Sequence, residues 1–248
     1  MHSKNKMRKI SRRIFVGTLG SAAALAGAGW LLTRNDKPKE TSEMLTLYTF
    51  GDSILDCAHY NDHGVTPGSL LVKNDDKLFP EFRGQDLQSR GTVKLEHRAQ
   101  DGATVDSLPR QLQGLNPGQG RTVAIITIGG NDLLRGLVTD QGQAIDTFAS
   151  KLDTFLGQLP VQEIFIGNVY DPSFGDDSLN FLGIDPELAR RNHVRVNTAI
   201  ARTAANHKGK LVDLHAHFLT GDPSWLTRTI EPSLIGASEV RRCFLPYF

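Results

Sequence analysis

Runs of apolar residues recur along this chain at the length of buried strands. Five of them are "MLTLYTF" (44–50), "TVKLEHRA" (92–99), "TVAIITIGG" (122–130), "VQEIFIGNVY" (161–170) and "KLVDLHAHF" (210–218). Several are almost continuously apolar and rich in β-branched residues, which is typical of strands covered on both faces of a sheet. We therefore expect five strands in one parallel sheet.

Helical periodicity fills the intervals between these strands. Residues 142–158 place apolar side chains three and four positions apart, and residues 185–206 repeat the pattern. A last helix is expected within "PSLIGASEVRRCFL" (232–245). Strands that alternate with helices predict an α/β fold, a three-layer α/β/α doubly wound sandwich with a flavodoxin-like five-stranded parallel sheet over residues 45–248.

The N-terminal segment has a different character. Residues 1–40 contain nine Lys/Arg and two Asp/Glu, a charge of +7, although the whole chain carries only +1. Basic residues that include "SRRIFVG" precede an uncharged run over residues 14–32, which predicts a twin-arginine-like signal peptide or membrane anchor over residues 1–32. The polar residues 33–44 read as a linker. We expect a periplasmic or other extracytoplasmic protein, and cleavage and anchoring to the inner membrane both stay open.

Net charge bears on the binding partners of the predicted domain, and cysteine content bears on whether it has a disulfide. The remainder of the chain carries −6, so nucleic acid is not an expected partner. An oxidising compartment would permit a bridge between Cys57 and Cys243, but nothing in the sequence brings the two within reach. A disulfide and two free thiols both stay open, as does the oligomeric state.

The first predicted strand ends in "FGDSILDCAHYND". A parallel sheet holds its ligand at the carboxyl ends of its strands, which is where Ser53 stands. Ser53 also precedes a predicted helix, "SILDCAHY", and an N-cap role is the alternative to a nucleophile. The Gly-x-Ser-x-Gly elbow of α/β-hydrolases is absent around Ser53.

Two further strand ends favour the nucleophile. "TIGGND" places Asn131, an amide donor, after the third strand, and "AQDGAT" places Gly102 after the second. Donors of this kind stabilise a developing oxyanion. Ser53 with Gly102 and Asn131 predicts an acyl-transfer site.

"GDSILD", Gly102 in "DGAT" and "GGND" together resemble the sequence blocks of the SGNH (GDSL-type) hydrolase superfamily of esterases, lipases and deacylases. The resemblance covers nearly the whole domain. It implies a serine esterase with Ser53 as nucleophile, an oxyanion hole formed by the Ser53 N–H, Gly102 and Asn131, and no cofactor. The implied substrates are lipid, sugar O-acyl or other small esters.

The family's last block, Asp-x-x-His, is missing. Aligned on its Pro and Gly, the histidine falls on Glu231 and the aspartate on Arg228. Glu231 is then the candidate general base, although a carboxylate is normally less basic than imidazole. Burial would raise its pKa, whereas Arg228 and the N-terminus of the following helix would lower it.

Histidines elsewhere are the alternative bases. His215 is the first substitute, and His59 and His63 follow Ser53 in the chain. If the fifth strand persists, Asp213, His215 and His217 share one face, but two nitrogens and one carboxylate are a poor metal set, and no metal is expected.

A protein that has lost its base would still bind its ligand. Loss of general-base assistance costs about 10²–10⁴-fold in rate, so a catalytically weak binding protein for an acylated or glycan ligand is the alternative function. The long segment 59–91 is the candidate for substrate selection, and a surface excursion packing its own apolar residues is the other interpretation. Membrane attachment through residues 14–32 also stays open.

Overall fold

A computed structural model describes residues 44–116, 120–179 and 181–248. The predicted signal segment, and all of the predicted linker except residue 44, lie outside the described residues. Within the described part of the chain, no helix is both long and apolar enough to cross a membrane.

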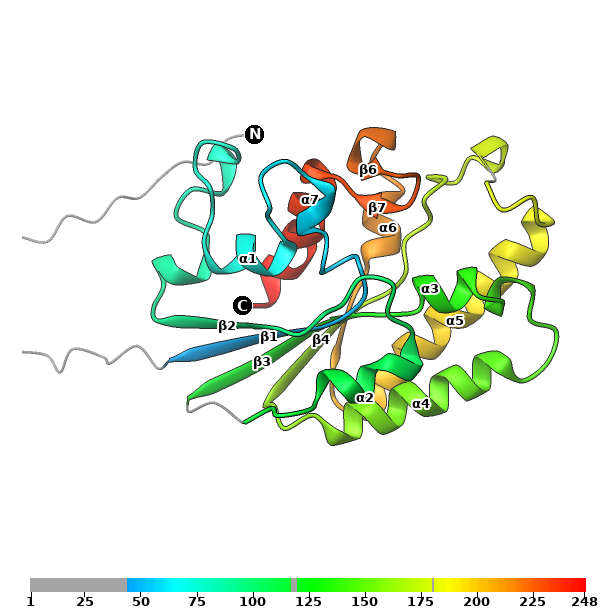
Figure 1. The fold of residues 1–248 in the computed structure, drawn as a ribbon, viewed down its shortest axis with the longest axis horizontal. Helices are drawn as coiled ribbons and strands as arrows, with labels where there is room; N and C mark the ends of the chain where they lie inside the picture. Colours follow the sequence, from blue (N-terminus) through cyan, green and yellow to red (C-terminus); the bar gives the residue numbers. More distant parts are fainter. Residues whose placement is uncertain (1–43, 117–119, 180) are drawn as a thin grey trace, which may run out of the picture. The chain divides into compact units, whose positions relative to one another are not determined.

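Five parallel strands form the central sheet in the order β2-β1-β3-β4-β5 (Figure 1). Their bounds are β1 Leu45–Gly51, β2 Val93–His97, β3 Arg121–Thr127, β4 Glu163–Gly167 and β5 Lys210–Val212. Every residue of β1 is buried, which explains why its apolar run does not alternate with polar residues. The predicted parallel sheet is confirmed, and the strands end at a common carboxyl edge.

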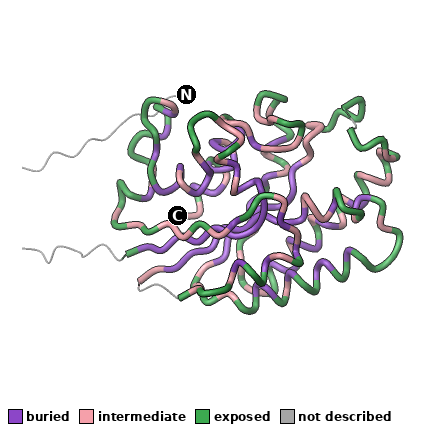
Figure 2. Tube along the Cα trace, in the orientation of Figure 1, coloured by how far each residue is buried: buried purple, intermediate pink, exposed green. Residues whose placement is uncertain are grey.

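Helices cover both faces of the sheet, with the buried core between the layers (Figures 1 and 2). Alternate side chains of a strand point to opposite faces. On one face, Leu47 belongs to the core that includes α1 (Pro67–Val72) and α7 (Leu234–Phe244). On the other, Phe50 packs with α4 (Ala144–Gln158) and α5 (Pro186–Asn206). The predicted α/β/α sandwich and its two long helices are confirmed.

Shorter elements complete the domain. The remaining helices and strands are α2 Leu108–Gln111, α3 Gly130–Leu134, α6 Leu214–Phe218 and an antiparallel pair formed by β6 Leu226–Thr227 and β7 Glu231–Pro232. Single 3-10 turns are Ala58–Tyr60, Pro80–Phe82, Leu87–Ser89, Val105–Ser107, Leu137–Thr139, Asp177–Leu179, Pro223–Trp225 and Leu245–Tyr247. The β6–β7 pair, which the sequence did not predict, carries Glu231.

The fifth strand is shorter than its apolar run predicts. It ends at Val212, and the Asp213 side chain accepts a hydrogen bond from the Ala216 amide, capping α6. An aspartate in this position stops the strand because its carboxylate satisfies free amides at a helix start. The strand does not persist to His217, so the condition under which Asp213, His215 and His217 would share one face is not met.

Segment 59–91 packs onto the domain rather than projecting from it. Leu70 and Leu71 of α1, with Phe79 and Phe82, belong to the core that α7 also joins. These residues turn the long connection into a layer of the fold, which favours the packing interpretation of this segment.

Both cysteines are free thiols in the structure. Cys57 is buried, and Cys243 is half-buried on α7. Burial raises the pKa of each thiol to about 12, so both stay protonated at neutral pH.

Candidate active site

Ser53 lies in a tight turn at the carboxyl end of β1. The turn is closed by the Leu55 and Asp56 amides, which both donate to the Asp52 carbonyl. The helix predicted over residues 53–60 is wrong: only Ala58–Tyr60 is helical, as a single 3-10 turn. Ser53 thus caps no α-helix at this turn, and its side chain is 7% exposed.

Asp52 is a buried carboxyl beside the candidate nucleophile. Its Oδ1 accepts a hydrogen bond of 2.8 Å from the Thr127 hydroxyl and one of 3.3 Å from the Ile54 amide. Burial raises its pKa to about 7, and the two hydrogen bonds oppose that rise. This carboxyl braces the Ser53 turn against the end of β3.

Hydrogen bonds connect α3, which carries Asn131, to the loop that contains Gly102. Asn131, in the first turn of α3, donates from Nδ2 to the Ala103 carbonyl at 3.1 Å. Arg135, one turn further along the chain, donates to the Gly102 carbonyl, also at 3.1 Å. Gly102 has a φ of +72°, a conformation that favours glycine. An amide nitrogen carries two hydrogens, so Asn131 retains one for an oxyanion.

The Gly102 loop is also anchored from the other side. Asp56, in the "GDSILD" block, accepts a hydrogen bond of 2.9 Å from the Asp101 amide. Its other oxygen lies 3.2 Å from Nε2 of His97. Asp56 therefore links the Ser53 turn to the loop that presents the Gly102 N–H.

Glu231 meets Ser53 at this edge of the sheet. The Ser53 side chain lies close enough to the Glu231 carboxylate to lower its pKa by favouring the charged form, but burial raises the pKa more. Glu231 Oε2 is buried without a hydrogen-bond partner, which disfavours the ionised form further. Arg228 acts in the predicted direction but is too weak to prevent a net rise of the Glu231 pKa.

Charged and aromatic side chains line the outer side of Glu231. His59 Nε2 lies 3.1 Å from Asp101 Oδ2, and the Tyr60 hydroxyl donates to the same oxygen at 2.7 Å. The Arg228 guanidinium stacks over the Tyr60 ring, 5.0 Å from its centre. Asp101, His59 and Arg228 all act on the Glu231 pKa, so this polar rim adjoins the carboxylate.

The other candidate histidines make different contacts. The His215 ring packs edge-on against His193, 4.8 Å away, and its amide donates to Asn168. His217 Nε2 lies 2.8 Å from Glu239 Oε2 of α7. His63 is exposed, with its amide bonded to Asn61. In the described residues no group of three or more His, Cys, Asp or Glu is arranged to hold a metal ion.

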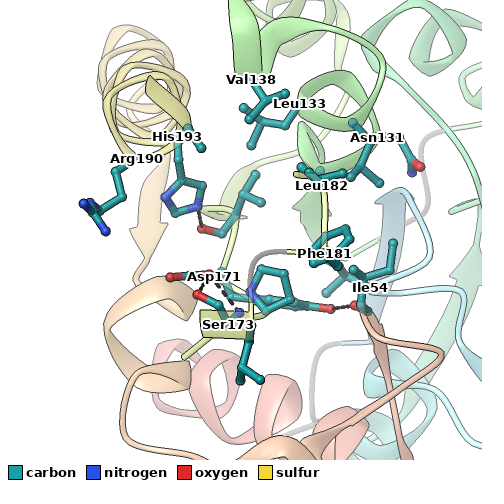
Figure 3. A pocket seen from close by; sticks show the side chains of 18 of the residues that line it. Ile54, Asn131, Leu133, Val138, Asp171, Ser173, Phe181, Leu182, Arg190 and His193 are labelled. Atoms are coloured by element: carbon teal, nitrogen blue, oxygen red, sulfur yellow. Dashed lines mark hydrogen bonds between the residues drawn. The ribbon is translucent and has the colours of Figure 1, made fainter. Parts of the chain in front are cut away.

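A cavity of about 170 Å³ opens beside Ser53, between α3, α5 and the connection from β4 to α5 (Figure 3). Ser53, Gly130 and Asn131 are among its lining residues, and Figure 3 shows Leu133, Val138, Phe181 and Leu182 on its walls. No described residue of segment 59–91 lines it. The sequence analysis missed this connection, whose only signal was its length.

His193 is the other lining residue that sequence reasoning missed. It projects from α5, and its Nε2 lies 2.8 Å from the Val169 carbonyl (Figure 3). Burial lowers its pKa, with His215 acting in the same direction. The imidazole is therefore neutral at pH 7.

Comparison with known proteins supports this arrangement. The chain matches the model of the GDSL-like lipase/acylhydrolase family over residues 49–234. No curated protein matches it.

Several solved structures share the fold. An acetylxylan esterase from Geobacillus stearothermophilus has a TM-score of 0.58 at 20% identity, with 83% of this chain and 94% of that chain covered. A lipase/acylhydrolase from Enterococcus faecalis has a TM-score of 0.57 at 18% identity, over 82% of this chain and 95% of that one. An α/β hydrolase enzyme from the metagenome of Lake Arreo, Spain, has a TM-score of 0.56 at 22% identity, over 83% and 94%.

The fold and the residues gathered at its carboxyl edge define a hydrolase acting on ester bonds. The family match covers well over half of the chain, so the chain belongs to the GDSL-like lipase/acylhydrolase family. The family resemblance inferred from "GDSILD" and "GGND" is thereby confirmed.

Proposed function

We propose that this protein is an exported carboxylic-ester hydrolase in which Ser53 is the nucleophile and Glu231 replaces the missing histidine as general base. The observation that carries this proposal is the position of the half-buried Glu231 carboxylate beside Ser53, whose side chain acts on the Glu231 pKa. A nucleophile beside a base, with an amide donor on the same cavity, is the minimum arrangement for acyl transfer.

The reaction proceeds in two halves. Glu231 accepts the Ser53 proton as Oγ attacks the ester carbonyl, and the resulting oxyanion is held by the Ser53 and Gly102 amides and the Asn131 side chain. The intermediate collapses, Glu231 returns the proton to the leaving alkoxide, and an acyl-serine remains. Water then attacks the acyl-serine and passes a proton to Glu231, and Glu231 returns that proton to the departing Ser53 Oγ, so that the acid is released and Ser53 is regenerated.

The raised pKa of Glu231 makes a carboxylate a better base than its ordinary value allows. Burial and the unpartnered Oε2 hold the pKa above its usual range, which increases the affinity of the carboxylate for the Ser53 proton. Activity requires the ionised form of Glu231. kcat/KM should therefore rise with pH through the Glu231 pKa and fall at lower pH, which gives the profile an acidic limb.

Three variants of the full chain test the assignment with p-nitrophenyl acetate. Ser53→Ala should reduce hydrolysis to the uncatalysed rate, and Glu231→Gln, which keeps shape but cannot take a proton, should reduce kcat about 10²–10⁴-fold. His215→Gln is the control and should retain activity. Equal turnover by wild type and Ser53→Ala would reject the enzyme assignment in favour of a binding protein, and loss of activity only in the histidine variant would remove Glu231.

A fourth variant separates a base from a structural carboxylate. Arg228 lowers the Glu231 pKa, so Arg228→Gln should shift the acidic limb of kcat/KM to higher pH. A limb that stays in place while activity falls would show that Glu231 does not titrate in the mechanism.

Export is supported by the basic and apolar pattern of residues 1–32. In a bacterium with a twin-arginine pathway, the full chain should be recovered outside the cytoplasm. Replacing Arg12 and Arg13 by lysine should retain it in the cytoplasm, whereas unchanged export would exclude this route.

A further inference from the structure

The cavity beside Ser53 is where half of the exposed large apolar side chains gather. Of the eight such side chains in the described residues, four line this cavity: Leu134, Leu179, Phe181 and Leu182. Buried Leu133 and Val138 continue the same wall. Exposed apolar side chains that gather at one site indicate a binding surface, whereas single scattered ones do not.

The polar groups of the cavity are occupied by their neighbours. Asp171 Oδ1 accepts hydrogen bonds from the Ser173 amide and hydroxyl, at 2.9 and 2.7 Å. Arg190 pairs with Asp177, and neutral His193 contacts the Val169 carbonyl. Because these groups already have partners, a polar ligand would gain little from them, whereas an apolar one would gain from leaving water.

The position of Glu231 indicates which half of the ester, acyl chain or alcohol, occupies the cavity. The leaving alkoxide must lie beside the group that protonates it, and Glu231 borders the polar rim of His59, Asp101 and Arg228. Neither Glu231 nor Gly102 lines the cavity, although Ser53 and Asn131 do. The acyl chain points away from the leaving oxygen at the carbonyl carbon, so the cavity receives the acyl chain and the polar rim receives the alcohol.

We propose that the enzyme is selective for esters of apolar acyl chains longer than acetyl, and that the acyl chain occupies the cavity between α3, α5 and the β4–α5 connection. This inference rests on the proposed function for its nucleophile. It goes beyond that function in two ways. The apolar wall of the cavity selects the acyl chain, and the alcohol half of the ester is polar.

A chain-length series on the full-length protein tests the proposal. Each methylene moved from water into an apolar site favours binding about 4-fold, so kcat/KM should rise on the order of 100-fold from p-nitrophenyl acetate to hexanoate. Rates are divided by those of hydroxide-catalysed hydrolysis of the same ester, which removes intrinsic reactivity. A flat or falling series would overturn the proposal.

Two cavity variants and one control show where the acyl chain binds. Ala189→Phe fills the cavity from α5 and should lower the ratio of kcat/KM for hexanoate to that for acetate at least about 10-fold. Ala201→Phe, at another half-buried alanine of α5 that does not line the cavity, is the matched control and should keep this ratio. Phe181→Ser, at an exposed wall residue, should lower the same ratio several-fold.

The outcomes separate this inference from the proposed function. Hydrolysis of acetate that depends on Ser53, with no chain-length preference or with equal losses in both alanine variants, overturns the acyl pocket alone. Turnover unaffected by Ser53→Ala overturns the proposed function itself. Thermal midpoints of the variants show whether a loss reflects unfolding.

Discussion

Gly51 decides how the chain leaves β1 for the nucleophile. Its φ is +117°, and a Cβ at this position would stand 1.6 Å from the Thr127 carbonyl oxygen of β3. Its amide also donates to Gln111 Oε1 at 2.8 Å, and Gln111 Nε2 donates back to the Gly51 carbonyl. The Gly in "GDS" is thus required by the close approach of two strands, which places Ser53 at the mouth of the sheet.

Gly51→Ala should therefore destabilise the protein by about 4 kcal/mol, because the added methyl collides with backbone that cannot move aside. Urea unfolding of wild type and variant measures the change. Gly142→Ala is the control: its nearest neighbour would be 3.8 Å away, so its effect should stay within about 0.5 kcal/mol. Equal effects in the two variants would contradict the steric argument.

At the scale of elements, a buried arginine adds polar and stacking contacts to the apolar packing of α7 on segment 59–91. Arg241 is 1% exposed, and its guanidinium lies over the Phe82 ring, 3.5 Å from the centre. It donates to Asn74 Oδ1 at 2.8 Å and to the Ser238 hydroxyl. Burial lowers its pKa to about 10, so it remains charged at neutral pH. The stacking and paired bonds explain why a long connection packs as a layer of the core.

Arg241→Ala should cost about 3 kcal/mol of unfolding free energy, because it leaves a cavity and unpaired polar groups. Arg241→Lys should recover little, since an ammonium cannot stack or bind in the same planar geometry. Arg242→Ala, at the exposed neighbour that pairs with Glu239 and Glu81 and lies over the outer side of Phe82, should cost less than about 1 kcal/mol because its contacts are exposed to solvent. Chemical denaturation compares them, and a full rescue by lysine would refute the stacking argument.

For the molecule as a whole, Asp52 couples global stability to pH. Its pKa is about 7 in the folded protein, against an ordinary value of 3.8 for an exposed aspartate in the unfolded chain. Between these values the unfolded chain has lost this proton while the folded chain keeps it, so Asp52 lowers stability progressively as pH rises from about 4 to 7. Below this window the effect is absent, and above it the effect is constant.

Asp52→Asn removes this titration. Relative to wild type, the variant should gain about 4 kcal/mol of stability between pH 4 and pH 7, since one pKa unit corresponds to about 1.4 kcal/mol. Denaturation midpoints across this range measure the difference. Asp176→Asn is the control: Ser178 lowers the pKa of this carboxyl, so it is ionised in both the folded and the unfolded chain over most of this range, and the variant should run parallel to wild type. Parallel curves for Asp52→Asn and wild type would contradict the assignment.

The pattern of apolar residues predicted the wrong local structure at two places where the contacts of a few groups determine the backbone. The apolar run 210–218 favours a strand, yet the Asp213 side chain caps a helix and ends β5 at Val212. "SILDCAHY" reads as a helix, yet the chain turns within Asp52–Leu55 to place Ser53 at the sheet edge. Both errors lie at strand ends, where tertiary contacts override local preference.

The sequence by itself determined the five-stranded parallel sheet and its helical layers, because apolar periodicity is a local property that reports burial directly. It also determined the family, since "GDSILD" and "GGND" stand in contiguous blocks. Only the tertiary structure decided which side chain lies beside Ser53 and which connection lines the cavity. Those contacts join β1 to β7 and α5, segments far apart in the chain, and no local pattern records the distance between them.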